Sequence, residues 1–364
     1  MSVLNPPSPR SDNCAFWRFS SVLERTVLRT ALAAAVLWPG TAVSQSIEEM
    51  VRWTGTLQLA ESREAMIVAP HAVATASVIT IADLREFRVS QFSHDGRRLR
   101  VAGGRGGGPG EFESPPLTAR PTSNGGLLVA EFGGRLHLFG PTGDSARTTR
   151  VPIFPFYDAT ALDGDRVLLV GWGPVAQRER AQRGQLLHEW SMREQRILKS
   201  YFELPVPDAL LPAARSFGNV ATAIRGDTAF AVFTLTDTVC KFSVTSDNQT
   251  GKVPIRSSLL KRAVDAPPAL ASAEARNKWM ESVSVIDAPY HPRDGRLLVQ
   301  FSERFGAVRK YRLLLLNAEG EVSGQASEAP QLMAAYESGA NTVLLFANRD
   351  DDEPNVWRKA ELRH

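Results

Sequence analysis

The sequence predicts an all-β fold, a six-bladed β-propeller with four-stranded antiparallel blades. Three observations support this prediction. Short apolar runs recur along the chain, turns rich in Gly, Asp or Asn precede most of them, and a second strand follows most of them. A chain of 364 residues, 43% of them hydrophobic, is long enough for one large closed β-architecture.

The buried strands of the repeat are predicted from six apolar runs between turns. The runs are 78–81, 127–129, 167–170, 229–232, 297–299 and 343–346. The turns before the last five contain Gly125-Gly126, Gly164-Asp165, Gly226-Asp227, Asp294-Gly295 and Gly339-Ala340-Asn341. Gly and Asn adopt positive φ angles in such turns at little cost. A second strand, as in RLHLFGPTG or YRLLLLNAEG, and then a third strand follow, so the six units indicate radial repetition.

Residues 101–143 contain the clearest copy of the repeat. They combine GGPGEF at 107–112, Pro115, GGLLVA at 125–130, Arg135, Phe139 and Gly143. This combination resembles an NHL-type repeat, in particular that of the GPGE-bearing six-bladed β-propellers of bacterial envelopes. Glu131 stands where the family pattern often has Asp, and the usual Asn before Arg135 is missing. The resemblance covers about residues 78–145 and implies the fold more than a function.

The two ends of the chain predict how the ring closes. The last unit, QLMAAYES, TVLLFANR and NVWRKAEL, supplies three strands and lacks an outer one. Residues 54–59 (TGTLQL) form an early strand that has no unit of its own. We expect this N-terminal strand to complete the last blade, because that pairing would satisfy strand edges that would otherwise be bare.

The first 44 residues have the pattern of an export signal. Arginines at 18, 25 and 29 precede the apolar run TALAAAVLW, and Ala42-Val43-Ser44 places small residues before a cut at Gln45. The run is shorter than the ~20 residues that span a bilayer. An uncleaved anchor and a buried helix are the competing interpretations. We predict a signal peptide at 1–44, a single propeller domain at 45–364, no transmembrane segment in the mature chain, and a periplasmic, envelope-associated or extracellular location.

Cysteine content and charge limit the functions that the mature chain could have. Cys14 lies in the predicted signal, so Cys240 would remain alone and could form no intrachain disulfide. Cys240 alternates in phase with Phe242 and Val244, which predicts a buried thiol. Without the first 44 residues the chain loses four Arg and two acidic residues, and the net charge falls from +3 to +1. This small charge argues against nucleic-acid binding, which depends on neutralising many phosphates.

One face of the predicted propeller is expected to carry the functional residues. In each blade the loop between strands two and three, and the loop to the next blade, share a face. The irregular segments 171–184, 204–219 and 257–282 fall on it, and loops on a rigid scaffold often carry function. Hairpin tips on this face supply the candidate contact residues, which are Arg85, Glu131, Arg135, Trp172, Asp237, Arg304 and Arg349.

Two functions remain open after these observations. The first is an exported monomeric binding module that holds a protein, peptide or saccharide through the loop-rich face, without a cofactor. The alternative is a metal-dependent hydrolase or lyase, similar to lactonases, with a divalent metal in the central channel. No catalytic motif supports it, but ligands from different blades would leave no local spacing, and His71 is the best-placed histidine. The acidic run at 350–353 is expected to be a solvated hairpin tip rather than a calcium loop.

Overall fold

The computed structural model describes residues 45–364, except 62–66, 69, 144, 145, 155, 164, 174–184, 204, 205, 212, 215–219, 246–248, 266–271, 307, 349–352 and 364. Contacts divide the chain into Met1–Gly40 and Thr41–His364, and all the described residues belong to the second unit. The predicted signal peptide at 1–44 lies outside the described residues.

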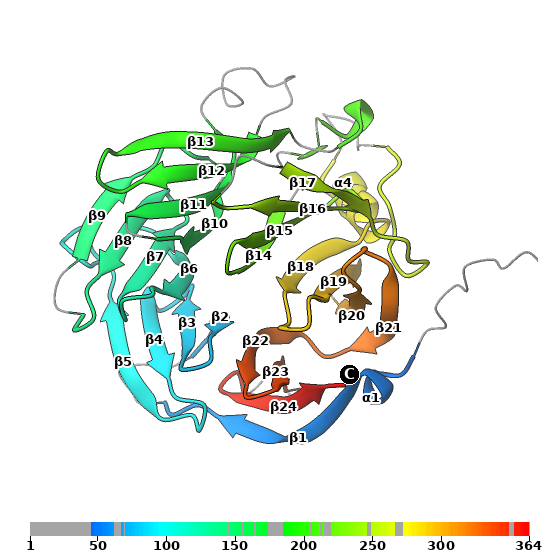
Figure 1. The fold of residues 1–364 in the computed structure, drawn as a ribbon, viewed down its shortest axis with the longest axis horizontal. Coiled ribbons are helices and arrows are strands. Elements are labelled where there is room, and N and C mark those ends of the chain that lie inside the picture. The colour runs from blue at the N-terminus through cyan, green and yellow to red at the C-terminus, as the bar shows by residue number, and fades with distance from the viewer. Residues whose placement is uncertain are drawn as a thin grey trace, which may run out of the picture. The chain divides into compact units, whose positions relative to one another are not determined.

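Strands dominate the second unit and form six four-stranded antiparallel sheets, arranged around a central axis (Figure 1). Each of the first five sheets takes four consecutive strands from the axis outward. The first two sheets are β2 (Pro70–Ala74), β3 (Ile79–Asp83), β4 (Arg88–Phe92) and β5 (Arg98–Gly103), then β6 (Pro116–Pro121), β7 (Leu127–Glu131), β8 (Arg135–Phe139) and β9 (Ala146–Arg150). The third is β10 (Phe156–Ala161), β11 (Arg166–Gly171), β12 (Gln185–Ser191) and β13 (Arg196–Glu203). The fourth and fifth are β14 (Val220–Arg225), β15 (Thr228–Phe233), β16 (Thr238–Ser243) and β17 (Gln249–Pro254), then β18 (Val285–Tyr290), β19 (Leu297–Phe305), β20 (Val308–Leu316) and β21 (Val322–Ala329).

The sixth sheet combines strands from the two ends of the described chain. Its order is β22 (Leu332–Ser338), β23 (Asn341–Ala347), β24 (Val356–Leu362) and β1 (Val51–Gln58). β1 pairs antiparallel with β24, from Val51 opposite Leu362 to Gln58 opposite Val356. Most of the predicted early strand at 54–59 is thus part of β1, whose partner lies in the last sheet.

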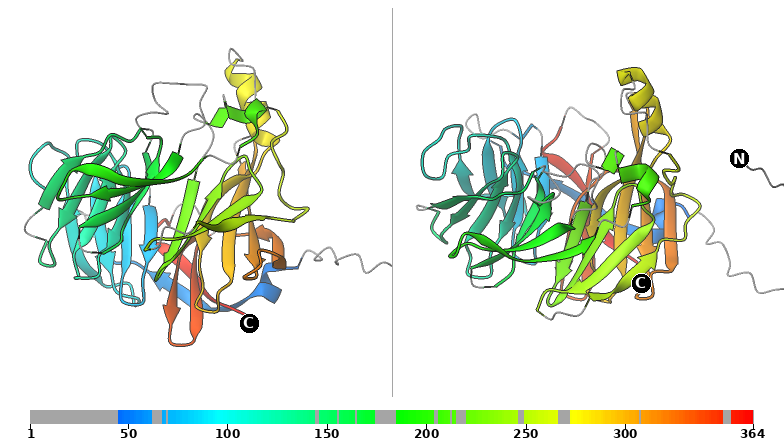
Figure 2. Two further views of the ribbon diagram at one scale, coloured as in Figure 1. Left: turned by 45° about the horizontal axis from the view of Figure 1, so that its top comes forward. Right: turned by 90° about the horizontal axis from the view of Figure 1, so that it is seen from above.

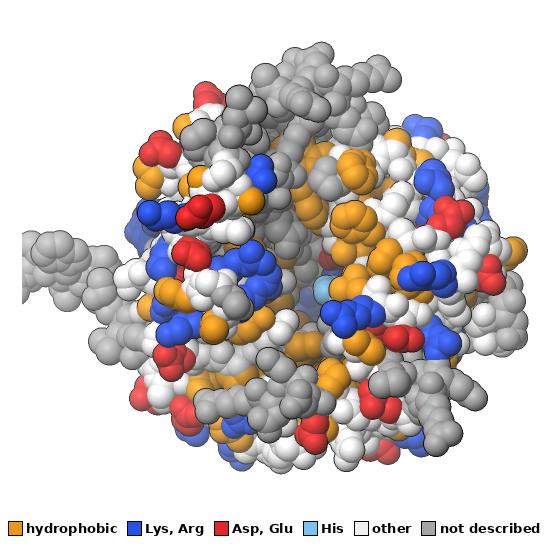
Figure 3. All heavy atoms as spheres, turned by 180° about the vertical axis from the view of Figure 1, so that it is seen from behind, with side chains coloured by type: hydrophobic (Ala, Val, Ile, Leu, Met, Phe, Trp, Pro, Cys, Tyr) orange, Lys and Arg blue, Asp and Glu red, His pale blue; other side chains and the backbone are white. Residues whose placement is uncertain are grey.

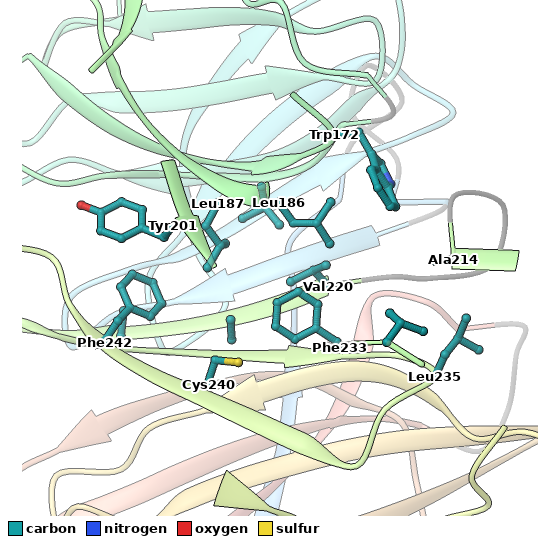
Figure 4. Close-up of a cluster of buried hydrophobic side chains, with 14 of the residues drawn as sticks. Trp172, Leu186, Leu187, Tyr201, Ala214, Val220, Phe233, Leu235, Cys240 and Phe242 are labelled. Carbon is teal, nitrogen blue, oxygen red and sulfur yellow. The ribbon is translucent and has the colours of Figure 1, made fainter. Parts of the chain in front are cut away.

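Six hydrophobic clusters fill the spaces between neighbouring sheets. Cys240, Phe242 and Phe233 of the fourth sheet share one cluster with Leu187 and Tyr201 of the third and with Trp172, which follows β11 (Figure 4). Another cluster joins Leu345 and Trp357 of the sixth sheet to Ile79 and Ile81 of the first. The core is therefore distributed around the axis, and each sheet is held by its two neighbours.

The apolar runs that predicted the repeat all fall in second strands, where both faces of the sheet are covered. Every residue of β3 and β7 is buried, as are 297–303 in β19. A strand packed on both faces needs a continuous apolar run rather than alternation, which explains why this signal was clear in the sequence.

Helices are few and short within the described chain. They include α1 (Ile47–Met50), the 3₁₀ turn η1 (Asp208–Leu210) and α4 (Ala273–Glu281). Figure 2 shows α4 and η1 projecting from the same side of the ring. No described helix has the length and apolarity needed to cross a bilayer.

The Gly-rich stretch links β5 to β6. The Glu111 carboxylate accepts a hydrogen bond from the Gly108 amide at 2.8 Å, and the Phe112 amide donates to the Gly104 carbonyl at 2.8 Å. The Phe112 ring is fully buried, 5.1 Å from the His137 ring and 6.4 Å from the Phe139 ring. The stretch is a tight connection that inserts an aromatic ring between two sheets.

Candidate functional site

The innermost strands of all six sheets surround a central cavity of about 330 Å³. Much of its wall is small or apolar, with Val220, Leu332 and Met333 beside a set of alanines, Ala72, Ala74, Ala221, Ala223, Ala288, Ala334 and Ala335. Figure 3 shows a central hollow on one face, with hydrophobic and basic side chains around it. The cavity belongs to the fold itself, because only the inner strands approach the axis.

One side of the cavity carries a closed network of polar groups. Arg120 at the end of β6 donates from Nε and Nη2 to the two oxygens of Asp158 on β10, at 3.3 and 2.6 Å. Asp158 also accepts from the Thr222 hydroxyl at 3.3 Å and from the Ala159 amide at 2.8 Å. Bidentate pairs of this kind fix both partners in orientation as well as in charge.

His71 lies beside this network, on β2. His71 is exposed to the cavity and not to the outer surface. The inner strands of the other sheets surround that cavity. Burial lowers the pKa of His71, and the nearby Asp158 carboxylate opposes that effect while the Arg120 guanidinium adds to it. The imidazole is therefore neutral at pH 7, and its nitrogens can donate or accept.

A second cluster of polar side chains lies where β14 and β18 end and the following turns begin. Glu337 Oε1 accepts from the Arg293 amide at 3.0 Å, the Tyr290 hydroxyl at 3.3 Å and Arg225 Nη1 at 3.5 Å. Burial raises the pKa of Tyr290, and the Glu337 carboxylate raises it further. The phenol therefore stays protonated and acts as a donor.

Asp287 is an acidic residue of the cavity wall, and its pKa is shifted upward. Burial raises the pKa of Asp287 to about 6, although Ser302 and Arg309 favour its charged form. Its Oδ2 atom is buried and has no hydrogen-bond partner among the described residues. Within the described ranges, no three His, Cys, Asp or Glu side chains come together in a way that could hold a metal ion.

Most of the described exposed large hydrophobic side chains lie on the loop-rich face. Eight are described, and five of them lie on hairpins between second and third strands or on connections between sheets, namely Phe132, Phe154, Val264, Phe305 and Val308. The ammonium groups of Lys261 and Lys310 lie 4.9 and 5.4 Å from the centre of the Phe305 ring. The other three, Leu99, Val101 and Leu198, lie on outermost strands.

Two of the sequence-predicted site residues lie together inside the molecule rather than at a solvated tip. Glu131 is fully buried at the end of β7, and its Oε1 contacts His137 Nε2 at 2.5 Å and Arg135 Nε at 3.7 Å. Hydrogen bonds from His137 and from the Ser114 amide and hydroxyl outweigh burial and lower the pKa of Glu131. Arg135 also pairs with Glu113 at 2.8 Å. This cluster ties β7, β8 and the Gly-rich connection together.

The other predicted residues are spread around the face. Trp172 is buried, and its indole donates to the Tyr157 hydroxyl at 3.2 Å. Asp237 pairs with Arg262 at 3.0 Å. Arg85 and Arg304 are exposed on the β3–β4 turn and the β19–β20 hairpin. Arg349 and 350–352 of the acidic run lie outside the described residues. The role of all seven as contact residues stays a prediction.

Several residues of this region were missed from the sequence. Phe132 follows Glu131 directly. An aromatic residue within the turn EFGGR could have predicted an exposed apolar side chain at this hairpin. Arg120, Asp158 and Thr222 come from three different sheets, so no local spacing could reveal that they meet. His71 was recognised, but its environment depends on the same three sheets.

A second hollow lies away from the axis. It measures about 620 Å³ and is bordered by Gln45 to Glu48 and by parts of β20 and β21.

No protein-family model and no curated protein sequence matches the chain. Solved structures do match its fold. A member of the DUF4221 family from Bacteroides vulgatus has a TM-score of 0.61 at 11% identity, covering 86% of this chain and 98% of that chain. A putative exported protein from Bacteroides fragilis has a TM-score of 0.57 at 10% identity, covering 89% and 98%. The WD40 repeats of RRP9 have a TM-score of 0.50 at 11% identity, covering 86% and 100%.

These likenesses show a propeller-type fold and nothing narrower. The resemblance of 78–145 to NHL-type repeats therefore stays a prediction about family. The word "exported" describes the protein from Bacteroides fragilis, and the shared fold does not extend it to this chain.

Proposed function

We propose that the chain is an exported, NHL-like propeller that acts as a binding module and holds a protein partner through its loop-rich face. The observation that carries this proposal is that five of the eight described exposed large hydrophobic side chains lie on that face, three of them phenylalanines. Aromatic residues are enriched at protein interfaces, and exposed apolar side chains concentrated on one face favour an interaction site.

Charge around Phe305 favours a partner surface with acidic and apolar groups. Lys310 flanks the ring and Arg304 is exposed beside it, whereas Lys261 on the other side is paired with Glu303 at 2.8 Å. The export part of the proposal is supported by the signal pattern at 1–44 and by the exported neighbour from Bacteroides fragilis. We infer in addition that β1 closes the ring by pairing with β24, which gives the face a rigid base with six blades.

Site-specific photo-crosslinking in the cells that produce the protein tests this function. A photoreactive phenylalanine analogue is placed at position 132, 154 or 305, and the matched controls carry it at 99 or 198. We expect crosslinks to one defined protein from the three face positions and none from the outer-strand positions, because only the face would contact the partner. Equal crosslinking from both sets, or none from the face, would contradict the proposal.

The channel alternative, a metal-dependent hydrolase or lyase, has less support in the geometry. The best-defined carboxylate of the cavity, Asp158, already accepts four hydrogen bonds, and no three possible metal ligands come together among the described residues. Elemental analysis of the purified chain 45–364 separates the two functions. A stoichiometric divalent metal would favour the enzyme.

A further inference from the structure

A threonine, a histidine and a glutamate of the second sheet form a hydrogen-bonded line. Thr148 Oγ1 lies 3.0 Å from His137 Nδ1, and His137 Nε2 lies 2.5 Å from Glu131 Oε1. The three residues belong to β9, β8 and β7, and Thr148 stands directly opposite His137 in the strand register. A hydroxyl, an imidazole and a carboxylate in this order are the groups of a nucleophile activated by a base.

The carboxylate determines which nitrogen of the imidazole carries the proton. Glu131 is fully buried, and although burial opposes the shift, hydrogen bonds from His137 and Ser114 lower the pKa of Glu131. An ionised carboxylate only accepts hydrogen bonds, so His137 Nε2 donates to it and Nδ1 is left as an acceptor. Thr148 Oγ1 therefore donates to Nδ1, which is the direction that a general base requires.

The base is buried, whereas the residue that carries the hydroxyl is exposed. His137 is fully buried, and the centres of the Phe112 and Phe139 rings lie 5.1 and 6.2 Å from the centre of its ring. A low local dielectric strengthens the two hydrogen bonds of the imidazole. Thr148 is an exposed residue of the outermost strand β9, so a small molecule can approach it from solvent.

The third sheet contains a matching pair in which a carbonyl replaces the carboxylate. His188 stands opposite Ser200 on β12 and β13, and its Nδ1 lies 2.7 Å from Ser200 Oγ. His188 Nε2 lies 3.1 Å from the carbonyl of Gly171, which ends β11 as Glu131 ends β7. A carbonyl has no charge to stabilise an imidazolium, and burial lowers the pKa of His188 to about 4. Of the two pairs, the one in the second sheet therefore has the stronger base.

We propose that Thr148 is an activated nucleophile that accepts acyl groups from small esters, with His137 as its general base. Thr148 Oγ1 attacks the ester carbonyl carbon while its proton passes to His137 Nδ1, and the Glu131 carboxylate stabilises the imidazolium. The ester C–O bond then breaks, and the leaving alcohol takes the proton from His137. Water repeats the two steps on the acyl-threonine, which releases the acid and restores the hydroxyl. This activity goes beyond the holding of a protein partner.

Two probes test the nucleophile in the purified chain 45–364 at neutral pH. p-Nitrophenyl acetate reports turnover through the release of p-nitrophenol, and a fluorophosphonate leaves a stable adduct that peptide mass spectrometry locates. We expect the adduct on Thr148 to form about a hundredfold faster than on Thr142 or Ser200, a ratio typical of general base catalysis. Thr142 is exposed in the preceding turn, and Ser200 has a histidine without the carboxylate.

Substitutions at Thr148 separate activation from folding, because the residue is exposed and its replacement should leave the sheet intact. Thr148→Ser keeps the hydroxyl and should retain both reactions, whereas Thr148→Val should lower ester turnover at least tenfold. His137→Gln removes the base and should slow the adduct on Thr148 about a hundredfold, provided that thermal unfolding shows the variant to be folded. The ¹⁵N chemical shifts of His137 in the parent chain give a second measurement, and we expect a proton on Nε2 and none on Nδ1.

The proposal is overturned if Thr148 is labelled no faster than Thr142, if Thr148→Val retains the ester turnover, or if His137 carries its proton on Nδ1. None of these results bears on the crosslinking from positions 132, 154 and 305, so the two proposals can fail separately.

Discussion

A single backbone position shows how the Gly-rich stretch works at the scale of residues. Gly103 has a φ of +90°, which side chains rarely tolerate, and a Cβ atom there would lie 2.1 Å from Phe112 Cε2. The ring cannot move aside, because Phe112 is fully buried against Phe139 and His137. The glycine is thus required by the Phe112 ring, which lies between the first two sheets.

Gly103→Ala is expected to lower the free energy of unfolding by about 2 kcal/mol or more, since it combines an unfavourable φ with an overpacked ring. Urea unfolding of the chain 45–364 measures the loss. Gly107→Ala is the matched control in the same stretch, because its Cβ would meet nothing nearer than Glu113 Oε1 at 3.6 Å. An equal effect of the two substitutions would show that Phe112 does not set the requirement.

Cys240 illustrates what a local pattern can predict about one residue. Its alternation with Phe242 and Val244 predicted a buried thiol, and the thiol is fully buried in the cluster between the third and fourth sheets. Burial raises the pKa of Cys240 to about 11, which keeps it a thiol at neutral pH and makes it unreactive. A short pattern sufficed here because burial follows directly from strand alternation.

At the scale of elements, the second strands were predictable and the innermost strands were not. β7 and β11 contain the continuous apolar runs 127–130 and 167–170, whereas β10 reads FYDATA and mixes polar with small residues. Inner strands face both the core and a cavity, so their composition serves two environments. Asp158 and Thr222 could therefore be located only when the sheets were placed around the axis.

The helix α4 is stabilised at its N-terminus by a capping residue. It buries no residue completely, although Trp279 and Met280 pack in part against the cluster between the third and fourth sheets. The Ser272 hydroxyl accepts a hydrogen bond from the Ala275 amide at 3.1 Å, and the Trp279 indole donates to the Asp265 carbonyl. These two bonds fix its position beside the loop-rich face.

Ser272→Ala should lower the stability of α4 by about 1 kcal/mol, the usual contribution of such a cap. Hydrogen exchange should then quicken about fivefold in 273–281 while the melting temperature of the propeller stays the same. Ser272→Asp preserves the cap and should exchange as the parent does. A fall in global stability would mean that α4 is part of the core.

At the scale of the whole molecule, a repeated pattern predicted more than any single motif. Six apolar runs with their turns predicted the six four-stranded sheets, because each sheet needs a second strand that is covered on both faces. The site could not be predicted in the same way. His71, Arg120 and Thr222 come from three sheets and meet only because the sheets surround an axis.

Removal of β1 is expected to damage the whole ring. A chain that begins at residue 60 loses the pairing with β24 and the burial of Val51, Leu57 and Leu59. We expect a loss of roughly 5 kcal/mol from the apolar side chains alone, and self-association through the bare edge of β24. Calorimetry and size-exclusion chromatography of the chains 45–364 and 60–364 measure both effects. A shortened chain that is monomeric and equally stable would refute the role given to β1.

The sixth sheet also imposes an order in time. Among the strands, β1 is synthesised first, and its partner β24 is synthesised last. β1 must therefore wait, with its hydrogen-bonding edge open, until every other strand has been made. A chain that stops anywhere before β24 can build several sheets and still leave its own first strand without a partner.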